Sequence, residues 1–343
     1  MRILKFPVKI NPSNSKKLQL LVDKIIILAK ALQHIPINNV QKQNIFHQEL
    51  LKSSLFSAKI EGNQLTLIQA QQIDLTNPRK KSHLEVSNVL KARSKIKKIP
   101  EQLEISHLQN LHQVIMHKLL DNAGKLRLES SAIFDQFGNI VYLTPSPEEI
   151  KLMLQSFLKK INQKYEDLNQ QLFIVAQSHY YFEKIHPFLD GNGRTGRILT
   201  HYLLCRLKFF GDFVLPLDEY FNQNRSKYYR LLEKNTTNVF EFVKFFLEGI
   251  VWSLEKLLED ISNLDDQNVF DKSAITKQKI INLLPRRQEI LQIVTDHEYC
   301  SFNFISRRFS TIPKRTIAND ISQLVKQKLM IKHGQTRGVV YSV

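Results

Sequence analysis

The sequence predicts a mainly α-helical protein that carries one β-hairpin and ends in a winged helix-turn-helix. Apolar residues recur at helical spacing along nearly the whole chain, as in HLQNLHQVIMHKLL (107–120) and FEFVKFFLEGIVWSLEKLL (240–258). Strict alternation of apolar and polar residues is confined to residues 133–143 and to the C-terminus. Helices therefore dominate, and strands are expected only at these two places.

Length and composition are those of an ordinary globular protein. The 343 residues, 43% of them hydrophobic, suffice for two or three domains with a sizeable core. The N-terminus lacks a basic stretch followed by an apolar run, and charged residues interrupt LLVDKIIILAKAL (20–32), so we expect neither a signal peptide nor a membrane span. Cys205 and Cys300 are far apart and lack metal-ligand spacing. These features predict a cytoplasmic protein without a disulfide framework or a zinc site.

The net charge of +17 indicates an acidic partner, either a nucleic acid, a nucleotide or an acidic protein surface. Residues 272–343 contain thirteen Lys and Arg against four Asp and Glu, so this last fifth of the chain carries more than half of the excess. A lysine-rich surface that serves only solubility remains an equal alternative.

The chain divides into four predicted segments: an N-terminal helical region (1–100), a central domain (101–260), a polar linker (261–276) and a C-terminal domain (277–343). The last segment reads as three helices followed by a hairpin, the order found in a winged helix-turn-helix. Its third helix opens with Lys314 and Arg315, where DNA phosphates or base edges would lie, and Arg337 falls at the wing tip. Dimerisation or protein docking by this domain remains open.

The central domain holds the densest polar motif of the chain, HPFLDGNGRTGR (186–197). Within it, GNGRTG matches the dinucleotide fingerprint G-x-G-x-x-G, which is credible only after a β-strand. Here a helical pattern, QQLFIVAQSHYYFEKIHPF, precedes the glycines. The motif is therefore predicted to be a loop between two helices, and a Rossmann site is excluded.

The residue types of this loop suit a polyphosphate. Gly191 and Gly193 permit a tight turn that exposes successive N–H groups, and the following helix adds the positive end of its dipole. Arg194 and Arg197, three positions apart, can grip phosphates from neighbouring faces of that helix. We therefore expect a nucleoside triphosphate as the ligand.

The loop also contains groups for a metal and for proton transfer. Asp190, next to the phosphate cradle, is suited to a magnesium ion that bridges phosphates. His186 can take a proton from an attacking hydroxyl near neutral pH. Phe188 is expected to anchor the loop to the core.

HPFLDGNGRTGR fits without departure the signature HxFx(D/E)GNGRxxR, and on it the chain resembles the Fic family. The resemblance implies the Fic helical bundle with a β-hairpin flap, and transfer of AMP from ATP to a Ser, Thr or Tyr hydroxyl of a target protein. It implies that His186 is the general base, Asp190 the magnesium ligand and Asn192 the group that orients the α-phosphate. The residues implied to hold the β- and γ-phosphates are Gly191, Gly193, Arg194 and Arg197.

Two further segments resemble parts of Fic proteins. Residues 124–147 (GKLRLESSAIFDQFGNIVYLTPSP) look like the flap that positions the target by strand addition, although an ordinary connecting hairpin is the alternative. NRSKYYRLLEKN resembles the segment that lines the adenine pocket, which makes Tyr228 and Tyr229 candidates for nucleobase contact. They could equally be core aromatics.

An inhibitory element is expected at FSAKIEGN (56–63), which ends a helical stretch. Gly62 can end the helix, which leaves Glu61 in the last turn, where the helix dipole disfavours a negative charge. SAKIEGN matches the inhibitory Fic pattern (S/T)xxxE(G/N), with Ser57 and Glu61 one turn apart. The resemblance implies that Glu61 pairs with Arg197 at the γ-phosphate position, so that ATP binds unproductively.

The leading hypothesis is a self-inhibited protein adenylyltransferase that uses ATP and Mg²⁺. One alternative is a Fic enzyme that transfers another phosphate-containing group or removes AMP. The other is a DNA-binding regulator whose Fic domain senses a nucleotide. The partners expected are a target protein with a hydroxyl side chain, the protein itself and DNA, without a membrane, and the resemblance implies a homo-oligomer.

Overall fold

The computed structural model describes residues 6, 12–74, 77–134, 140–233, 239–269, 284–297, 299–310, 312–327, 329–334 and 339–342. It divides into two compact units. The helical unit comprises Met1–Leu65 and Leu75–Glu259, and the C-terminal unit comprises Thr66–Asp74 and Asp260–Val343.

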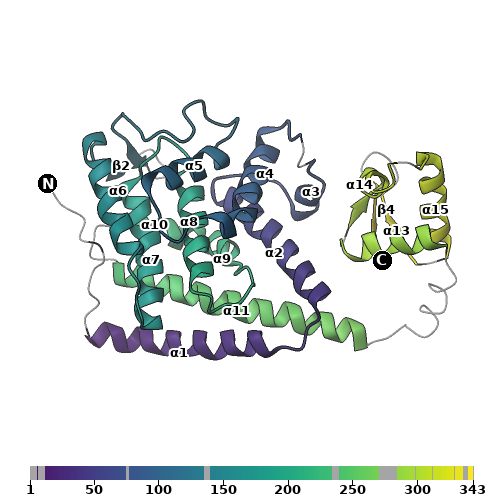
Figure 1. Cartoon of the computed structure of the whole chain (residues 1–343), viewed down its shortest axis with the longest axis horizontal. Coiled ribbons are helices and arrows are strands. Elements are labelled where there is room, and N and C mark those ends of the chain that lie inside the picture. The colour runs from purple at the N-terminus through teal and green to yellow at the C-terminus, as the bar shows by residue number, and fades with distance from the viewer. Residues whose placement is uncertain are drawn as a thin grey trace. The chain divides into compact units, whose positions relative to one another are not determined.

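The structure is mainly helical, with few strands, as the sequence predicts (Figure 1). In chain order its helices up to the central pair are α1 (Pro12–His34), α2 (Asn39–Ile60), α3 (Leu67–Gln71), α4 (Lys81–Ser94), the 3₁₀ turn η1 (Ile96–Lys98), α5 (Ile105–Ile115), α6 (Pro147–Ile161), α7 (Leu168–Ile185) and α8 (Asn192–Arg206). They continue with α9 (Leu217–Gln223), α10 (Arg225–Glu233) and α11 (Val239–Val269).

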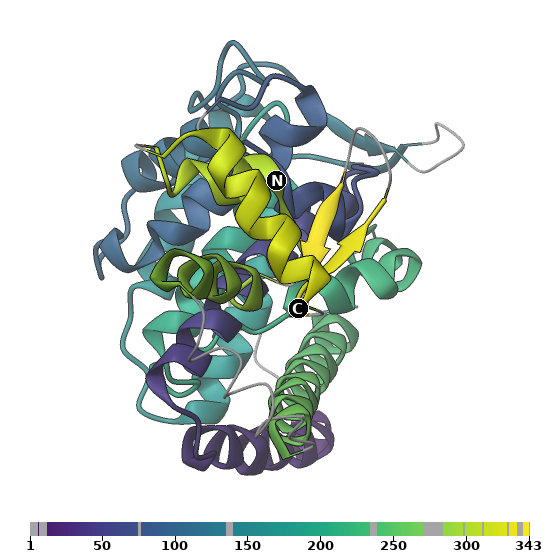
Figure 2. The same ribbon diagram turned by 90° about the vertical axis from the view of Figure 1, so that its right-hand side faces the viewer.

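The central helices α7 and α8 pack against each other and are buried along most of their length. Because the polar motif connects them, its loop is held at one end of this buried helix pair. Helix α2 packs on α4 and α9 and also contacts α8. Helices α1 and α11 run side by side, where Lys24 Nζ lies 2.6 Å from Glu255 Oε1 (Figures 1 and 2).

The predicted hairpin is present as β1 (Ala132–Phe134) and β2 (Ile140–Leu143), which pair antiparallel with an irregular register between Ile133 and Phe134. The pair forms a two-stranded sheet, so one edge of each strand lacks a strand partner among the described residues.

The C-terminal unit has the predicted three helices followed by two strands, and it has in addition a short strand between the first and second of these helices (Figure 2). Besides α3 and the end of α11, it contains α13 (Pro285–Thr295), β3 (Cys300–Ser301), α14 (Phe302–Arg307), α15 (Lys314–Lys326), β4 (Ile331–His333) and β5 (Val340–Ser342). The strands form an antiparallel sheet in the order β3-β5-β4 around one apolar cluster. Arg337, placed by the sequence at the wing tip, lies outside the described residues.

The predicted linker differs from the structure at its beginning. Helix α11 continues to Val269, so residues 261–269 are helical, and residues 270–276 lie outside the described part of the chain. Ile261 is fully buried and extends the apolar face that includes Leu254 and Leu257, which gives the helix a reason to continue. None of the described helices is long and apolar enough to cross a membrane.

Candidate active site at the α7–α8 loop

The motif forms a tight loop because both of its ends have left-handed backbone. Helix α7 ends at Ile185, and His186 follows as the C-cap with φ 49° and ψ 58°. Helix α8 begins after Gly191, whose φ is 78°. A Cβ atom on Gly191 would lie 2.5 Å from Met116 Sδ, so glycine is required there by both conformation and space.

His186 is oriented by its own helix end. Its Nδ1 lies 3.2 Å from the carbonyl oxygen of Glu183. A carbonyl oxygen only accepts, so Nδ1 carries the hydrogen, and Nε2 of the neutral ring keeps its lone pair. Burial lowers the pKa of His186, and Arg127 lowers it further, against the Glu183 hydrogen bond and the carboxylates of Glu61 and Asp190. The histidine is therefore neutral, and basic at Nε2, near pH 7.

The interior of the loop is held by two side chains. Asn192 accepts the N–H of Phe188 at 2.9 Å and donates to its carbonyl oxygen at 2.8 Å. Phe188 is fully buried, as expected for an anchor, and stacks on His112 with 3.8 Å between the ring centroids. The structure thus uses Asn192 to fix the loop backbone.

His112 on α5 binds the same loop, a role that the sequence did not reveal. Its Nε2 lies 2.8 Å from the carbonyl oxygen of Asp190, and its Nδ1 accepts the N–H of Gly124 at 2.8 Å. This arrangement requires the neutral Nε2–H tautomer, and burial lowers the pKa of His112 in the same sense. His112 therefore connects the loop to the beginning of the flap segment.

Asp190 lies at the mouth of the loop with 62% of its side chain exposed. Its Oδ1 accepts the N–H of Gly191 at 2.6 Å and lies 3.5 Å from Arg194 Nη2. One exposed carboxylate suits a magnesium ion that takes its remaining ligands from phosphates and water. The described residues include no cluster of three or more His, Cys, Asp or Glu side chains, so the residues present fit only such a shared ion.

Arg197 is the most heavily bonded cation of the site. Its Nε donates to Ser57 Oγ at 2.9 Å, and its Nη2 donates to the Ser57 carbonyl at 2.9 Å and to Glu61 Oε1 at 2.8 Å. Asp218 Oδ1 lies 3.4 Å from Nε, while Asp218 Oδ2 pairs with Arg93 at 2.5 Å. Burial alone would lower the pKa of Arg197, but Glu61 and the other neighbours raise it above its ordinary value.

Glu61 links the end of α2 to the beginning of α8. Gly62 has φ 99°, and its N–H and that of Asn63 bond back to Lys59 and Ala58, the pattern of a Schellman C-cap. A Cβ on Gly193 would lie 2.4 Å from Glu61 Oε1, so the carboxylate covers the first turn of α8. The dipole of α8 and the Arg197 guanidinium thus offset the unfavourable position of Glu61 on its own helix.

A second carboxyl group, Glu183, is buried beneath the site. A Cβ on Gly196 would lie 2.4 Å from its Oε1, which has no hydrogen-bond partner among the described residues. Burial raises the pKa of Glu183 to about 8, and Glu61 raises it while Arg197 lowers it. Glu183 is therefore largely neutral at pH 7, which leaves Glu61 as the charged partner of Arg197 at this end of α2.

The two tyrosines proposed for the adenine pocket have different surroundings. Tyr228 is 1% exposed, and its hydroxyl lies 2.8 Å from His179 Nε2 inside an aromatic core. It cannot stack on a nucleobase without leaving that core, which corrects its assignment to the pocket. Tyr229 is partly exposed, donates to the Ile60 carbonyl at 2.9 Å and lies beside Arg225. Of the two tyrosines, Tyr229 remains available for a base near the end of α2.

Two parts of the chain match known protein families. Residues 102–204 match the Fic/DOC family, and residues 286–337 match a DeoR-like helix-turn-helix domain. The proteins named protein adenylyltransferase Fic of Drosophila sechellia and Drosophila persimilis are 29% and 30% identical over 235 residues, 66% of this chain. The match covers 44% and 42% of those relatives, so the chain spans less than half of their length.

Solved structures share the fold. A Fic family protein from Desulfovibrio desulfuricans superposes with a TM-score of 0.64 at 18% identity, over 99% of this chain and 98% of that one. Fic-1 from C. elegans superposes with a TM-score of 0.60 at 20% identity, over 74% and 75% of the two chains. The chain therefore contains a Fic/DOC-family domain, followed in the same polypeptide by a DeoR-like helix-turn-helix domain.

Proposed function

We propose that this protein is a self-inhibited adenylyltransferase that moves AMP from ATP to a hydroxyl side chain of a target protein. The observation that carries the proposal is the arrangement at one loop of a neutral histidine base, an exposed carboxylate and a helix N-terminus flanked by two arginines. The adenylyltransferase names of the Drosophila relatives support the same activity.

In the proposed reaction, Nε2 of His186 takes the proton of the target hydroxyl as its oxygen attacks the α-phosphorus of ATP. A new P–O bond to the target forms, the bond between the α-phosphorus and the bridging oxygen to the β-phosphate breaks, and pyrophosphate leaves. The second amide hydrogen of Asn192 remains for the α-phosphate, while the other holds Phe188. The first turn of α8, with Gly191, Gly193, Arg194 and Arg197, would receive the β- and γ-phosphates.

Asp190 would hold a magnesium ion against the phosphates. When bound, the ion neutralises charge that develops on the leaving pyrophosphate. The exposed Leu128, which precedes β1, and the exposed Leu143, the last residue of β2, offer apolar contacts to a target segment that adds to a free strand edge. Tyr229 is the aromatic side chain proposed for the adenine.

The inhibitory part of the proposal rests on Glu61. Its carboxylate, 2.8 Å from Arg197 Nη2 and packed on Gly193, already occupies the anionic position at the beginning of α8. A γ-phosphate directed to the same arginine must displace this carboxylate or take another pose. Ser57 further fixes the Arg197 side chain beside Glu61, because both its hydroxyl and its carbonyl accept hydrogen bonds from Arg197.

Incubation of purified variants with α-labelled ATP and Mg²⁺, followed by gel electrophoresis, tests the proposal. Glu61→Gly is expected to raise labelling at least about tenfold over wild type, in line with the loss of a charge-assisted pair of about 1.5–3 kcal/mol. Glu61→Gly/His186→Ala is expected to abolish it. Glu166→Gly, at an exposed glutamate of the same unit, serves as the control and should match wild type.

The outcomes separate the alternatives. Equal labelling by wild type and Glu61→Gly would refute the inhibitory role of Glu61. A different added mass on the target, measured by mass spectrometry, would indicate transfer of another phosphate-containing group. Loss of AMP from a modified target would indicate hydrolytic removal of AMP, in which water positioned by Glu61 attacks the phosphorus, the bond to the target oxygen breaks, and AMP and the free hydroxyl are released. Absence of labelling in every variant, tested against lysate, would refute the transferase.

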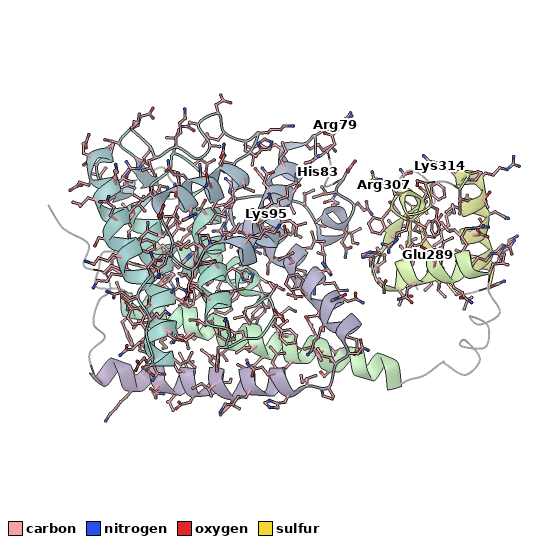
Figure 3. All side chains as sticks on the ribbon, in the orientation of Figure 1. Arg79, His83, Lys95, Glu289, Arg307 and Lys314 are labelled. Carbon is pink, nitrogen blue, oxygen red and sulfur yellow. The ribbon has the colours of Figure 1, made fainter. Side chains whose placement is uncertain are left out.

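A second proposed activity is DNA binding by the C-terminal unit. Lys314 (labelled in Figure 3) and Arg315 are exposed in the first turn of α15, and the DeoR-like match supports such a role. Binding to duplex DNA should weaken with salt, and Lys314→Ala/Arg315→Ala should lower the slope of log K against log salt by about 2. Salt-independent binding, or an unchanged slope, would favour a protein-docking role.

A further inference from the structure

Arg127, which precedes the hairpin, is bonded to both the catalytic loop and the two ends of the flap segment. Its Nε donates to the His186 carbonyl at 2.8 Å, and its backbone N–H donates to the Pro187 carbonyl at 3.0 Å. Its two Nη atoms donate to the carbonyls of Glu129 at 2.8 Å and Pro145 at 2.6 Å. The side chain is 2% exposed, so its position is fixed by these bonds.

These bonds complete the end of α7. The last carbonyls of a helix have no partner within the helix and require donors from elsewhere. His186 itself bonds to the Phe182 and Glu183 carbonyls, and the Tyr142 hydroxyl of β2 bonds to the Lys184 carbonyl at 3.2 Å. Arg127 then binds the His186 carbonyl, two residues further along the chain. The flap segment thus supplies two of the donors that cap the helix carrying the base.

Arg127 also acts on His186 through charge and conformation. A cation at a helix C-terminus is favourable, and here it fixes the carbonyl of a non-glycine residue with φ 49°. The charged groups that act on the His186 ring are Arg127, which disfavours the imidazolium, and Glu61 and Asp190, which favour it. Arg127 therefore favours the neutral base while it fixes the backbone that aims the ring.

We propose that Arg127 is a positioning residue that holds His186 in its reactive orientation and ties it to the flap. The proposal rests on the role of His186 as the base under the proposed function. A target segment bound to the flap would shift the Glu129 and Pro145 carbonyls. Because the Arg127 guanidinium binds both of these carbonyls as well as the His186 carbonyl, the shift would reach the catalytic histidine.

The first test does not depend on activity. The His186 signal in NMR spectra of the full chain, identified by its loss in His186→Ala, is titrated with pH in three variants. Arg127→Gln is expected to raise the pKa of His186, because a positive charge is removed. Arg127→Lys keeps the charge and should leave the pKa close to that of wild type. Lys159→Gln, which removes an exposed cation near the end of α6, is the control and should have no effect.

The second test measures AMP transfer in the Glu61→Gly background. Arg127→Gln and Arg127→Lys are both expected to lower kcat about 10- to 100-fold with the KM for ATP changed less than about threefold. Lys159→Gln should match the parent. If Arg127→Gln does not fold, the proposal is tested with Arg127→Lys alone. This variant is expected to have a lower kcat and an unchanged pKa of His186.

Two results would overturn the proposal: an unchanged His186 pKa in folded Arg127→Gln, or a higher KM for ATP at unchanged kcat in either variant. A Glu61→Gly parent without AMP transfer would refute the proposed function instead, and the titration would still decide whether Arg127 acts on His186.

Discussion

At the scale of single residues, the site depends on side chains that orient backbone as much as on those that meet the ligand. The motif predicted His186, Asp190 and the two arginines, because those residue types at that spacing suit a triphosphate. It could not predict His112 or Arg127, because their partners are backbone carbonyls 78 and 59 residues away in sequence. Such bonds leave no periodic pattern in the chain.

The environment of His186 predicts the pH dependence of AMP transfer. Burial and Arg127 lower the pKa of its imidazole, and the reactive form is the neutral one, so the rate is lost only as pH falls through this lowered pKa. The acid limb of kcat for Glu61→Gly should have its midpoint below the ordinary histidine value of about 6.5. Removing Glu61 also removes a group that raises the pKa. A midpoint above 6.5 would contradict this assignment.

Gly191 is expected to be intolerant of any side chain. Its φ of 78° is costly for other residues, by about 1–2 kcal/mol, and a Cβ would lie 2.5 Å from the buried Met116 sulfur. Gly191→Ala should therefore destabilise the helical unit by about 2–4 kcal/mol in urea unfolding. Gly211→Ala is the control, since it shares a positive φ but has no atom closer than 3.8 Å to the added Cβ. Equal losses for the two variants would show that conformation alone matters.

At the scale of elements, the structure confirms the predicted hairpin and winged helix-turn-helix. Helices were predictable from apolar periodicity, and the glycine at position 62 marked the end of α2. The polar, weakly periodic residues 261–269 obscured the end of α11, because the buried Ile261 is followed in the sequence by the mainly polar run SNLDDQNV, which has no helical apolar spacing. The core position of Tyr228 was likewise undetermined, since an aromatic residue at helical spacing suits a core and a pocket equally.

The C-terminal unit contains a buried charge cluster that should control its stability. Asp320 is 2% exposed and accepts from Arg286 Nε at 2.6 Å and Arg287 Nε at 2.8 Å. Burial opposes ionisation, but the two arginines outweigh it and lower the pKa of Asp320. Asp320→Asn should cost this unit about 3 kcal/mol at pH 7, because two arginines lose their partner.

The lowered pKa fixes the pH dependence of that cost. The two arginine pairs of Asp320 contribute fully to the stability of the folded unit above about pH 3.9, the pKa of an aspartate in the unfolded chain. This contribution is lost as pH falls through the lower pKa of Asp320 in the folded unit. Urea unfolding of the full chain, followed by hydrogen-exchange labelling of residues 284–342, measures at each pH the difference in free energy of unfolding between wild type and Asp320→Asn. Glu289→Gln, at an exposed carboxylate on α13 (Figure 3), is the control and should leave stability unchanged. If wild type remained more stable than Asp320→Asn below pH 3, the proposed role of the Asp320 ion pairs would be contradicted.

At the scale of the whole molecule, the proposed inhibition joins distant parts of one polypeptide. The pair between Glu61 and Arg197 connects residues 136 positions apart, and only the resemblance to the inhibitory pattern named Arg197 as the partner of Glu61. Asp218, which lies between Arg197 and Arg93, gave no such signal, because it belongs to no motif and, with Glu219, reads as an ordinary acidic residue in the first turn of a helix.

A competitor carried on the same chain has an effective concentration that is set by the fold and does not change with dilution. Under the proposed inhibition, the apparent affinity for ATP would fall in proportion to the small fraction of molecules in which Glu61 has left Arg197, whatever the amount of protein. The specific activity of the wild-type chain at fixed ATP is therefore expected to stay constant over about three decades of protein concentration. Activity that rose on dilution would mean that a second copy supplies the inhibitory carboxylate. If the inhibitory carboxylate lies on the same chain, inhibition must be relieved by a ligand or target that binds more tightly to the form in which Glu61 has left Arg197. Dissociation of an inhibitor could not relieve it.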